Sequence, residues 1–158
     1  MKVTVEVLTY KEGLMSRVAH DLKLVADSVA VDDDFSACID ASSLRVVCVM
    51  KKGREARGTL SAKDVKSIED SLRSDVLHTR RHPEIRFSAG SVEGDPTAPR
   101  RVSGTLHLHG TERPIRLDFK GGEARVRLHQ PDFGIKPFSA MMGMLKVKPG
   151  VEVVVRLT

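Results

Sequence analysis

Two histidines of this chain have a spacing that could support metal binding. His107 and His109 are two residues apart, so on a β-strand both side chains would point to the same side, a geometry that can begin a zinc or copper site. Leu106 and Leu108 alternate with them and would take the inner face of the strand, which places both histidines outside. Because further ligands would have to arrive through the fold, the pattern favours a polar outer face over a metal site.

A hydrolytic site is the second chemistry that the sequence raises. His20 and Asp21 could form the histidine–carboxylate half of a catalytic triad. A nucleophile in a supporting context is missing, because there is no G-x-S-x-G elbow around Ser16 or Ser139. The chain also lacks a P-loop, a Rossmann glycine pattern and an H-E-x-x-H motif. We therefore expect a non-enzymatic protein without catalytic residues. A small hydrolase or metal enzyme is a less favoured alternative.

A basic run at residues 78–82, H-T-R-R-H, could hold a phosphate or carboxylate between Arg80 and Arg81. It directly follows a predicted helix, and positive charge is favoured at helix C-termini without any ligand. The net charge of +5 is mild. With five Phe, one Tyr and no Trp, few aromatic side chains are available for stacking on bases. We therefore expect no nucleic-acid partner.

Alternation of apolar and polar residues indicates β-strands over most of the chain. Turn residues separate them, and Gly121-Gly122 is the strongest hairpin signal. The predicted strands are residues 2–9, 20–30, 35–40, 44–50, 84–91, 101–109, 114–120, 123–129 and 147–157. An antiparallel meander this long must close or stack to hide its edges.

One helix interrupts the predicted strands, at residues 61–76. Its apolar positions recur at three- and four-residue steps and so share one face; they are Val65, Ile68, Leu72 and Val76. Ser61 and Asp64 resemble a capping box. A lone amphipathic helix in a β-rich chain needs an apolar surface, either a barrel mouth or a sheet. Because no linker or repeat is visible, we expect residues 1–158 to form one domain.

Composition narrows the class of protein. A hydrophobic fraction of 41% and a charged fraction of 30% are typical of a soluble globular domain. No apolar run is long enough to span a bilayer, and the N-terminus lacks the pattern of a secretory signal. We therefore expect a cytoplasmic protein, or a periplasmic one if a leader has been removed. Cys38 and Cys48 are expected to be reduced, unless they face each other across a hairpin.

Three motifs carry a family resemblance. The first is H-P-E-I-R-F-S at residues 82–88. The second is G-T-L-H-L-H-G at residues 104–110, followed by R-P-I at residues 113–115. The third is D-F-G-I at residues 132–135. In this order and spacing they resemble the YceI-like family of lipocalin-like, polyisoprenoid-binding barrel proteins.

The resemblance implies an apolar bore that holds a long isoprenoid or similar lipid tail, often in a homodimer. The expected fold is all-β, an antiparallel lipocalin-like β-barrel of about eight to nine strands with one amphipathic helix. The expected function is the binding, carriage or sensing of an isoprenoid or fatty-acyl chain, with no metal and no cofactor other than such a lipid.

Alternation also predicts which side chains line the bore. The expected lipid-binding residues are Val46, Cys48, Ile85, Phe87, Leu106, Leu108, Ile115, Leu117, Phe119, Val126, Leu128, Phe133 and Met141. Since almost none of them can form a hydrogen bond, the ligand should be mostly hydrocarbon. Burying ten CH₂ groups would contribute roughly 8 kcal/mol before ordering costs. The alternative is that the aliphatic side chains fill the core and that the barrel is a stress-response or protein-interaction module.

Overall fold

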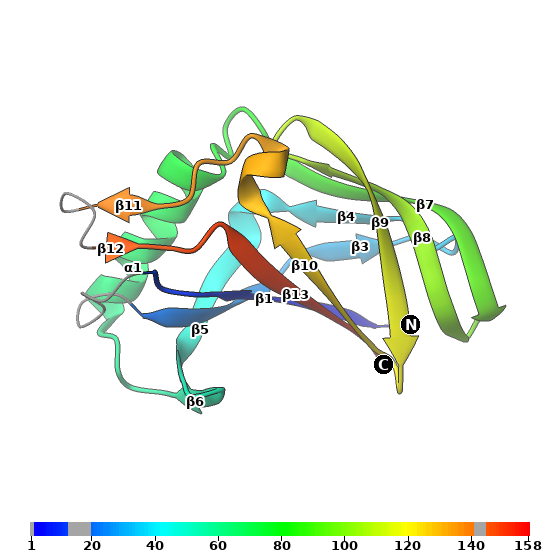
Figure 1. The fold of residues 1–158 in the computed structure, drawn as a ribbon, viewed down its shortest axis with the longest axis horizontal. Helices are drawn as coiled ribbons and strands as arrows, with labels where there is room; N and C mark the ends of the chain where they lie inside the picture. The colour runs from blue at the N-terminus through cyan, green and yellow to red at the C-terminus, as the bar shows by residue number, and fades with distance from the viewer. Residues whose placement is uncertain (1, 13–19, 141–144) are drawn as a thin grey trace.

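The computed structural model describes residues 2–12, 20–140 and 145–158. Its main feature is an 11-stranded antiparallel sheet that curls into a half-barrel, with one α-helix across one end (Figure 1). The strands are β1 (Val3–Thr9), β2 (Asp21–Ala26), β3 (Val29–Val31), β4 (Ala37–Asp40), β5 (Leu44–Lys51), β6 (Arg54–Ala56), β7 (Glu84–Asp95), β8 (Ala98–Leu108), β9 (Thr111–Lys120), β10 (Glu123–His129), β11 (Ser139–Ala140), β12 (Leu145–Lys146) and β13 (Gly150–Leu157). Short helical turns lie at η1 (Ala41–Ser43) and η3 (Gln130–Phe133).

The sheet combines local hairpins with one long-range pairing. Its strand order is β3-β4-β7-β8-β9-β10-β13-β1-β2-β5-β6, and β11 and β12 form a separate two-stranded sheet. The first long strand pairs with the last, with Val5 opposite Val155. Both chain ends therefore lie at the same end of the half-barrel, away from the helix (Figure 1).

The all-β prediction with one helix is confirmed, but the predicted strand count is wrong. The described residues form thirteen strands rather than eight to nine. One reason is that the long strand predicted at residues 20–30 breaks at Asp27 and Ser28 into β2 and β3. At the break, Asp27 N–H donates to the Ser43 carbonyl at 3.3 Å, and Asp40 N–H donates to the Ser28 carbonyl at 3.2 Å. The other reason is that β6, β11 and β12 are pairings of two or three residues, too short to show alternation.

The predicted helix is present as α1 (Ala62–Ser71), which continues into a π-helical turn, η2 (Leu72–Val76). Its capping box forms: Ser61 Oγ accepts from Asp64 N–H at 3.1 Å, and the Asp64 carboxylate accepts from Ser61 N–H at 3.2 Å. The Glu69 carboxylate accepts from Val46 N–H at 3.0 Å and so ties the helix to β5. Within the described residues, no helix is long and apolar enough to cross a membrane.

The two faces of the sheet differ in chemistry because side chains alternate along each strand. Val5 and Val7 of β1 face the interior, whereas Glu6 faces outward. Glu6 pairs there with Lys23 of β2 at 3.2 Å and with Arg156 of β13. The charged outer face stays hydrated, and the apolar inner face surrounds the space beneath α1.

Candidate ligand cavity

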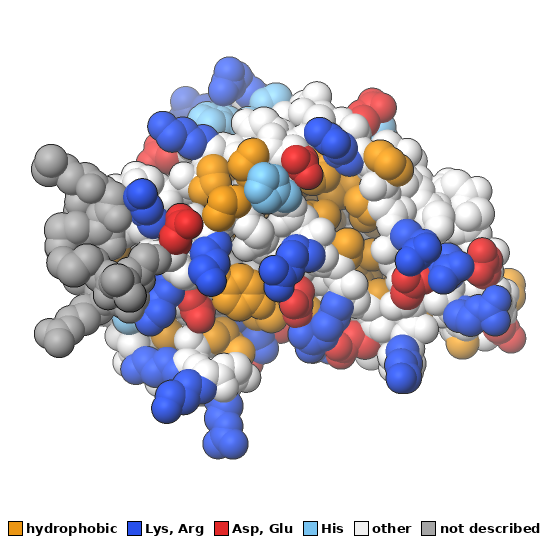
Figure 2. Space-filling model, in the orientation of Figure 1, with side chains coloured by type: hydrophobic (Ala, Val, Ile, Leu, Met, Phe, Trp, Pro, Cys, Tyr) orange, Lys and Arg blue, Asp and Glu red, His pale blue; other side chains and the backbone are white. Residues whose placement is uncertain are grey.

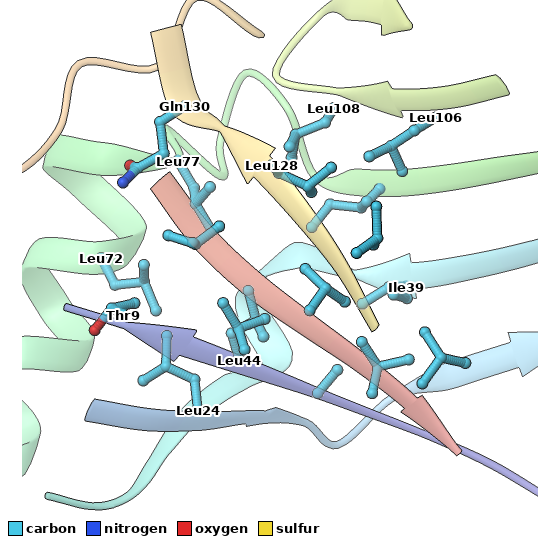
Figure 3. A pocket seen from close by; sticks show the side chains of 18 of the residues that line it. Thr9, Leu24, Ile39, Leu44, Leu72, Leu77, Leu106, Leu108, Leu128 and Gln130 are labelled. Atoms are coloured by element: carbon cyan, nitrogen blue, oxygen red, sulfur yellow. The ribbon is translucent and has the colours of Figure 1, made fainter. Parts of the chain in front are cut away.

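An apolar cavity of about 480 Å³ occupies the space between the curled sheet and α1. Eleven strands and the helix contribute side chains to its wall, and nearly all of these are aliphatic or phenyl groups. Figure 3 shows them converging from both sides, with Leu24 and Leu44 on one wall and Leu106 and Leu128 on the other. A volume of this size is within the range of small-molecule sites, about 300–1,000 Å³.

Most of the side chains that the sequence predicted for the lining are in it. They are Ile85, Phe87, Leu106, Leu108, Ile115, Leu117, Phe119, Val126, Leu128 and Phe133. The first nine lie on β7, β8, β9 and β10, four strands in which strict alternation continues through the inner-facing positions. Met141, also predicted, lies outside the described residues.

Val46 and Cys48 do not follow the prediction. Both are buried, but neither lines the cavity. For Cys48 the reason is a β-bulge between β2 and β5: Leu24 pairs with Val46 and Lys23 with Cys48, so Val47 is an extra residue in β5. Val46 is opposite Leu24, which lines the cavity, so the bulge does not account for Val46. The bulge puts Cys48 opposite outward-facing Lys23 and removes the two-residue periodicity on which the prediction depended.

A large part of the wall was absent from the predicted set. It comes from the first and last long strands, β2 and the helix; examples are Val5, Val153, Leu24, Ile68 and Leu72. The alternation V-T-V-E-V at residues 3–7 is a signal from which the inner-facing valines of β1 can be predicted. The apolar helix face was recognised, and the structure shows that it covers the cavity.

The polar part of the lining gathers at the end covered by α1. It consists of Thr9, His20, Ser67, Ser71, Gln130 and Lys146. Thr9 and Gln130 lie on the helix side of the cavity in Figure 3. At the opposite end the lining is apolar, with Val3, Phe35, Phe119 and Leu157. The cavity therefore has one polar end and one apolar end.

The two histidines considered as metal ligands separate in the structure. His107 lies on the outer face as predicted, with Nδ1 at 3.1 Å from the Glu112 carboxylate. His109 also stays out of the cavity lining, but it lies in the turn beyond the end of β8 at Leu108 rather than on the outer face of the strand. His109 and Gly110 form the turn to β9 with φ of 53° and 76°, which turns the His109 ring toward His78.

The histidine cluster, defined as His78, His82 and His109, joins the basic run to the β8–β9 turn. Ring centroids of His82 and His109 are 4.5 Å apart, and those of His78 and His109 are 5.2 Å apart. Burial, with further contributions from His82, His78 and Arg81, lowers the pKa of His109. Among the residues that the structure describes, no group of three or more His, Cys, Asp or Glu is arranged to hold a metal ion.

The residues considered for a triad serve other contacts. The Asp21 carboxylate accepts from the Lys11 N–H at 2.8 Å, and His20 lines the polar end of the cavity. Ser139 is exposed on β11, and Ser16 lies outside the described residues. Arg80 and Arg81 are exposed. On the face shown in Figure 2, Lys and Arg are interspersed with acidic side chains, and apolar side chains are visible in hollows between them.

Both cysteines are free. Cys38 on β4 pairs in register with Ala30 and Arg86, whereas Cys48 on β5 pairs with Lys23. The two therefore do not face each other across a hairpin, and the condition for a disulfide is not met.

The family model described as the YceI-like domain matches residues 2–158. The chain belongs to the YceI-like family. Two solved structures share the fold of this YceI-like chain over nearly its whole length. Burkholderia cenocepacia BcnA is 12% identical with a TM-score of 0.57, and the match covers 98% of this chain and 96% of that one. A polyisoprenoid binding domain from Saccharophagus degradans, described as implicated in plant cell wall breakdown, is 12% identical with a TM-score of 0.54, over 99% and 94% of the two chains. Among curated proteins, no sequence matches this one.

Proposed function

We propose that this YceI-like protein binds and carries an apolar chain, isoprenoid or fatty-acyl, inside the half-barrel. The observation that carries the proposal is the cavity of about 480 Å³ with its almost entirely hydrocarbon wall. A filled core would leave no such volume, since protein interiors pack at the density of organic crystals. The fold shared with the polyisoprenoid binding domain from Saccharophagus degradans supports the same class of ligand.

Hydrophobic transfer supplies enough free energy for this role. Each CH₂ that leaves water contributes about 0.8 kcal/mol, so an acyl or prenyl chain of ten carbons contributes roughly 8 kcal/mol before ordering costs. Micromolar affinity corresponds to about 8.2 kcal/mol, so a longer chain would be needed to offset the entropy lost on binding. Nearly all of the wall is hydrocarbon, which suits the carriage of an apolar chain.

Native mass spectrometry of the purified protein, combined with organic extraction and lipid analysis, tests the proposal. We expect a lipid of long chain to co-purify, or a fluorescent fatty-acyl probe to bind to the delipidated protein with 1:1 stoichiometry. A protein that carries no lipid and does not bind the probe would contradict it. The same spectrum reports whether the chain forms the homodimer expected from the family resemblance.

Neighbouring residues of β10 provide a matched pair of variants. Val126 lines the cavity, whereas Arg127 is exposed on the outer face of the same strand. Val126→Trp should fill part of the cavity and reduce probe binding at least tenfold, because the indole takes the volume that the chain needs. Arg127→Trp adds the same side chain outside and should leave binding unchanged. Equal binding by both variants would place the probe elsewhere on the protein.

A further inference from the structure

The uneven polarity of the cavity indicates how a ligand lies in it. Its polar lining residues are all at the α1 end, and the opposite end is apolar. A pure hydrocarbon would gain nothing from the polar end and would leave its hydrogen-bonding groups without partners. Such groups are costly when they are shut away from water. The asymmetry suits a ligand with a polar head and a long apolar tail.

Thr9 is the most informative residue at this end. Its hydroxyl oxygen is buried and has no hydrogen-bond partner among the described residues. Buried polar atoms in folded proteins nearly always have a partner, so an exception calls for an explanation. The side chain lies in the cavity wall at the end of β1, on the helix side of the cavity (Figure 3). The oxygen has almost no accessible surface, so a ligand in the cavity supplies the missing partner only when rotation about χ1 turns the Thr9 hydroxyl toward it.

Gln130 contributes a second polar group from the other side of β13. It is only 8% exposed, and its Nε2 donates to the Lys148 carbonyl at 3.1 Å. This bond fixes the orientation of the carboxamide, in which Oε1 is the atom that can accept a hydrogen bond from a ligand. Strand β13 lies between β1 and β10, so Thr9 at the end of β1 and Gln130 just after β10 line the same end of the cavity from opposite sides of β13.

The charge of this end favours an uncharged head. Among the residues that the structure describes, the buried polar groups are a hydroxyl and a carboxamide, and no carboxylate lines the cavity. Of the charged or titratable lining residues, Lys146 is exposed and His20 is only half-buried. A phosphate or carboxylate drawn to the depth of Thr9 would lose hydration, and the described part of the chain places no buried cation there to compensate. A hydroxyl, by contrast, can accept from Thr9 and donate to Gln130 Oε1.

We propose that the cavity takes a long-chain alcohol, with its hydroxyl head beneath α1 at Thr9 and Gln130 and its tail toward the opposite, apolar end. This inference rests on the proposed function and adds the head group and the orientation of the ligand. Thr9 is a specificity-determining residue in this arrangement, because the hydrocarbon tail alone would bind without it.

Three C15 isoprenoids distinguish the alternatives: farnesol, the hydrocarbon farnesene and farnesyl phosphate. Their affinities are measured by displacement of a fluorescent probe from delipidated wild-type protein, Thr9→Val, Thr9→Ser and Thr4→Val. Thr9→Val keeps the shape of the side chain and removes the hydroxyl, whereas Thr9→Ser keeps the hydroxyl. Thr4 is on the outer face of the same strand, opposite Arg156, so Thr4→Val is the matched control.

We expect wild-type protein to bind farnesol more tightly than the other two compounds. Thr9→Val should weaken farnesol binding about 3- to 10-fold, as expected for the loss of one hydrogen bond, and leave farnesene unchanged. Thr9→Ser and Thr4→Val should retain the preference for the alcohol. The ligand-free Thr9→Val protein should also melt at a higher temperature than wild type, because it no longer buries an unsatisfied hydroxyl.

An unchanged ratio of farnesol to farnesene affinity in Thr9→Val would overturn the assignment of the head site. Tighter binding of farnesyl phosphate than of farnesol would overturn the uncharged head. Both results leave the proposed function standing. If none of the three compounds binds to wild-type protein, the proposed function itself is contradicted, and the head site with it.

Discussion

Nδ1 of His78 lies 3.0 Å from Nε2 of His109, and this contact joins the segment after the helix to the turn between β8 and β9. On its other side, the His109 ring places Nδ1 at 3.3 Å from the Phe133 carbonyl of η3. A carbonyl can only accept, so Nδ1 of His109 carries a proton. In the neutral ring Nε2 is then the acceptor, and Nδ1 of His78 donates to it. One imidazole thus holds three separate segments together.

Folding stability should fall as the pH is lowered through the range in which His109 titrates. Burial is the largest cause that lowers the pKa of this histidine, followed by the charge of His82, and His78 and Arg81 also lower it. A depressed folded-state pKa means that the unfolded chain binds more protons below the ordinary pKa of about 6.5. The free energy of unfolding, measured by urea titration, should thus be greater at pH 7.5 than at pH 5.

His109→Asn isolates this contribution, since Asn tolerates the positive φ of the turn and does not titrate. The variant should lose less stability than wild type between pH 7.5 and pH 5. The same pH dependence in wild type and His109→Asn would show that other groups cause it.

Gly104 of β8 should not tolerate a side chain. A Cβ at this position would overlap with the Ser88 carbonyl oxygen and lie 2.8 Å from Cε2 of the Phe87 ring. The backbone oxygen cannot move without disturbing the β7–β8 pairing. Gly104→Ala should therefore reduce the free energy of unfolding by about 1–3 kcal/mol, measured by urea denaturation.

Gly90 in the adjacent strand is the matched control for this substitution. A Cβ there would have its nearest neighbour, the Ser103 carbonyl oxygen, at 3.5 Å, which is ordinary contact distance. Gly90→Ala should change stability by less than about 0.5 kcal/mol. Equal effects of the two substitutions would mean that the close approach of the Ser88 carbonyl oxygen is not what destabilises Gly104→Ala.

Glu69 should be the residue that holds the helix against the sheet. Its carboxylate accepts from the N–H of Val46, which is 6% exposed. Glu69→Ala would leave that buried N–H without its partner and should destabilise the fold by about 1–3 kcal/mol. Hydrogen exchange of the Val46 amide, followed by mass spectrometry or NMR, should become faster in the variant.

Asp70, the next residue, provides the comparison for Glu69. It is exposed and forms an i,i+4 ion pair with Lys66 at 2.9 Å. Such pairs contribute about 0.3–0.5 kcal/mol, so Asp70→Ala should have only a small effect on stability and none on the Val46 amide. If the Val46 amide also exchanged much faster in Asp70→Ala, residues other than Glu69 would also be holding the helix on the sheet.

The two thiols should react at very different rates. Cys38 is half-buried on β4, between Ala37 and Ile39, which line the cavity, so its side chain points outward. Cys48 is 5% exposed. Alkylation of the native protein with iodoacetamide, followed by peptide mass spectrometry, should modify Cys38 first and Cys48 only after urea is added. Equal labelling of both without urea would indicate frequent opening around β5.

Local periodicity was sufficient where each strand continues without interruption. The faces of Ile85, Leu106, Leu117 and Leu128 were predicted correctly because alternation depends only on the backbone of one strand. The capping box at Ser61 was also predicted, since its partners are three residues apart. The family motifs in the same part of the chain predicted a lipocalin-like barrel, whereas the sheet of the structure curls into a half-barrel.

Tertiary structure decided the features that depend on distant partners. The bulge opposite Leu24 moved Cys48 out of the predicted lining, and the two-residue turn moved His109 from the outer face into the histidine cluster. The polar end exists only because pairing of the first strand with the last brings Thr9 to the end of the cavity that also contains Gln130. Sequence spacing reports which way a side chain points along its own strand. Which other side chains it meets is set by strand pairing across the whole chain.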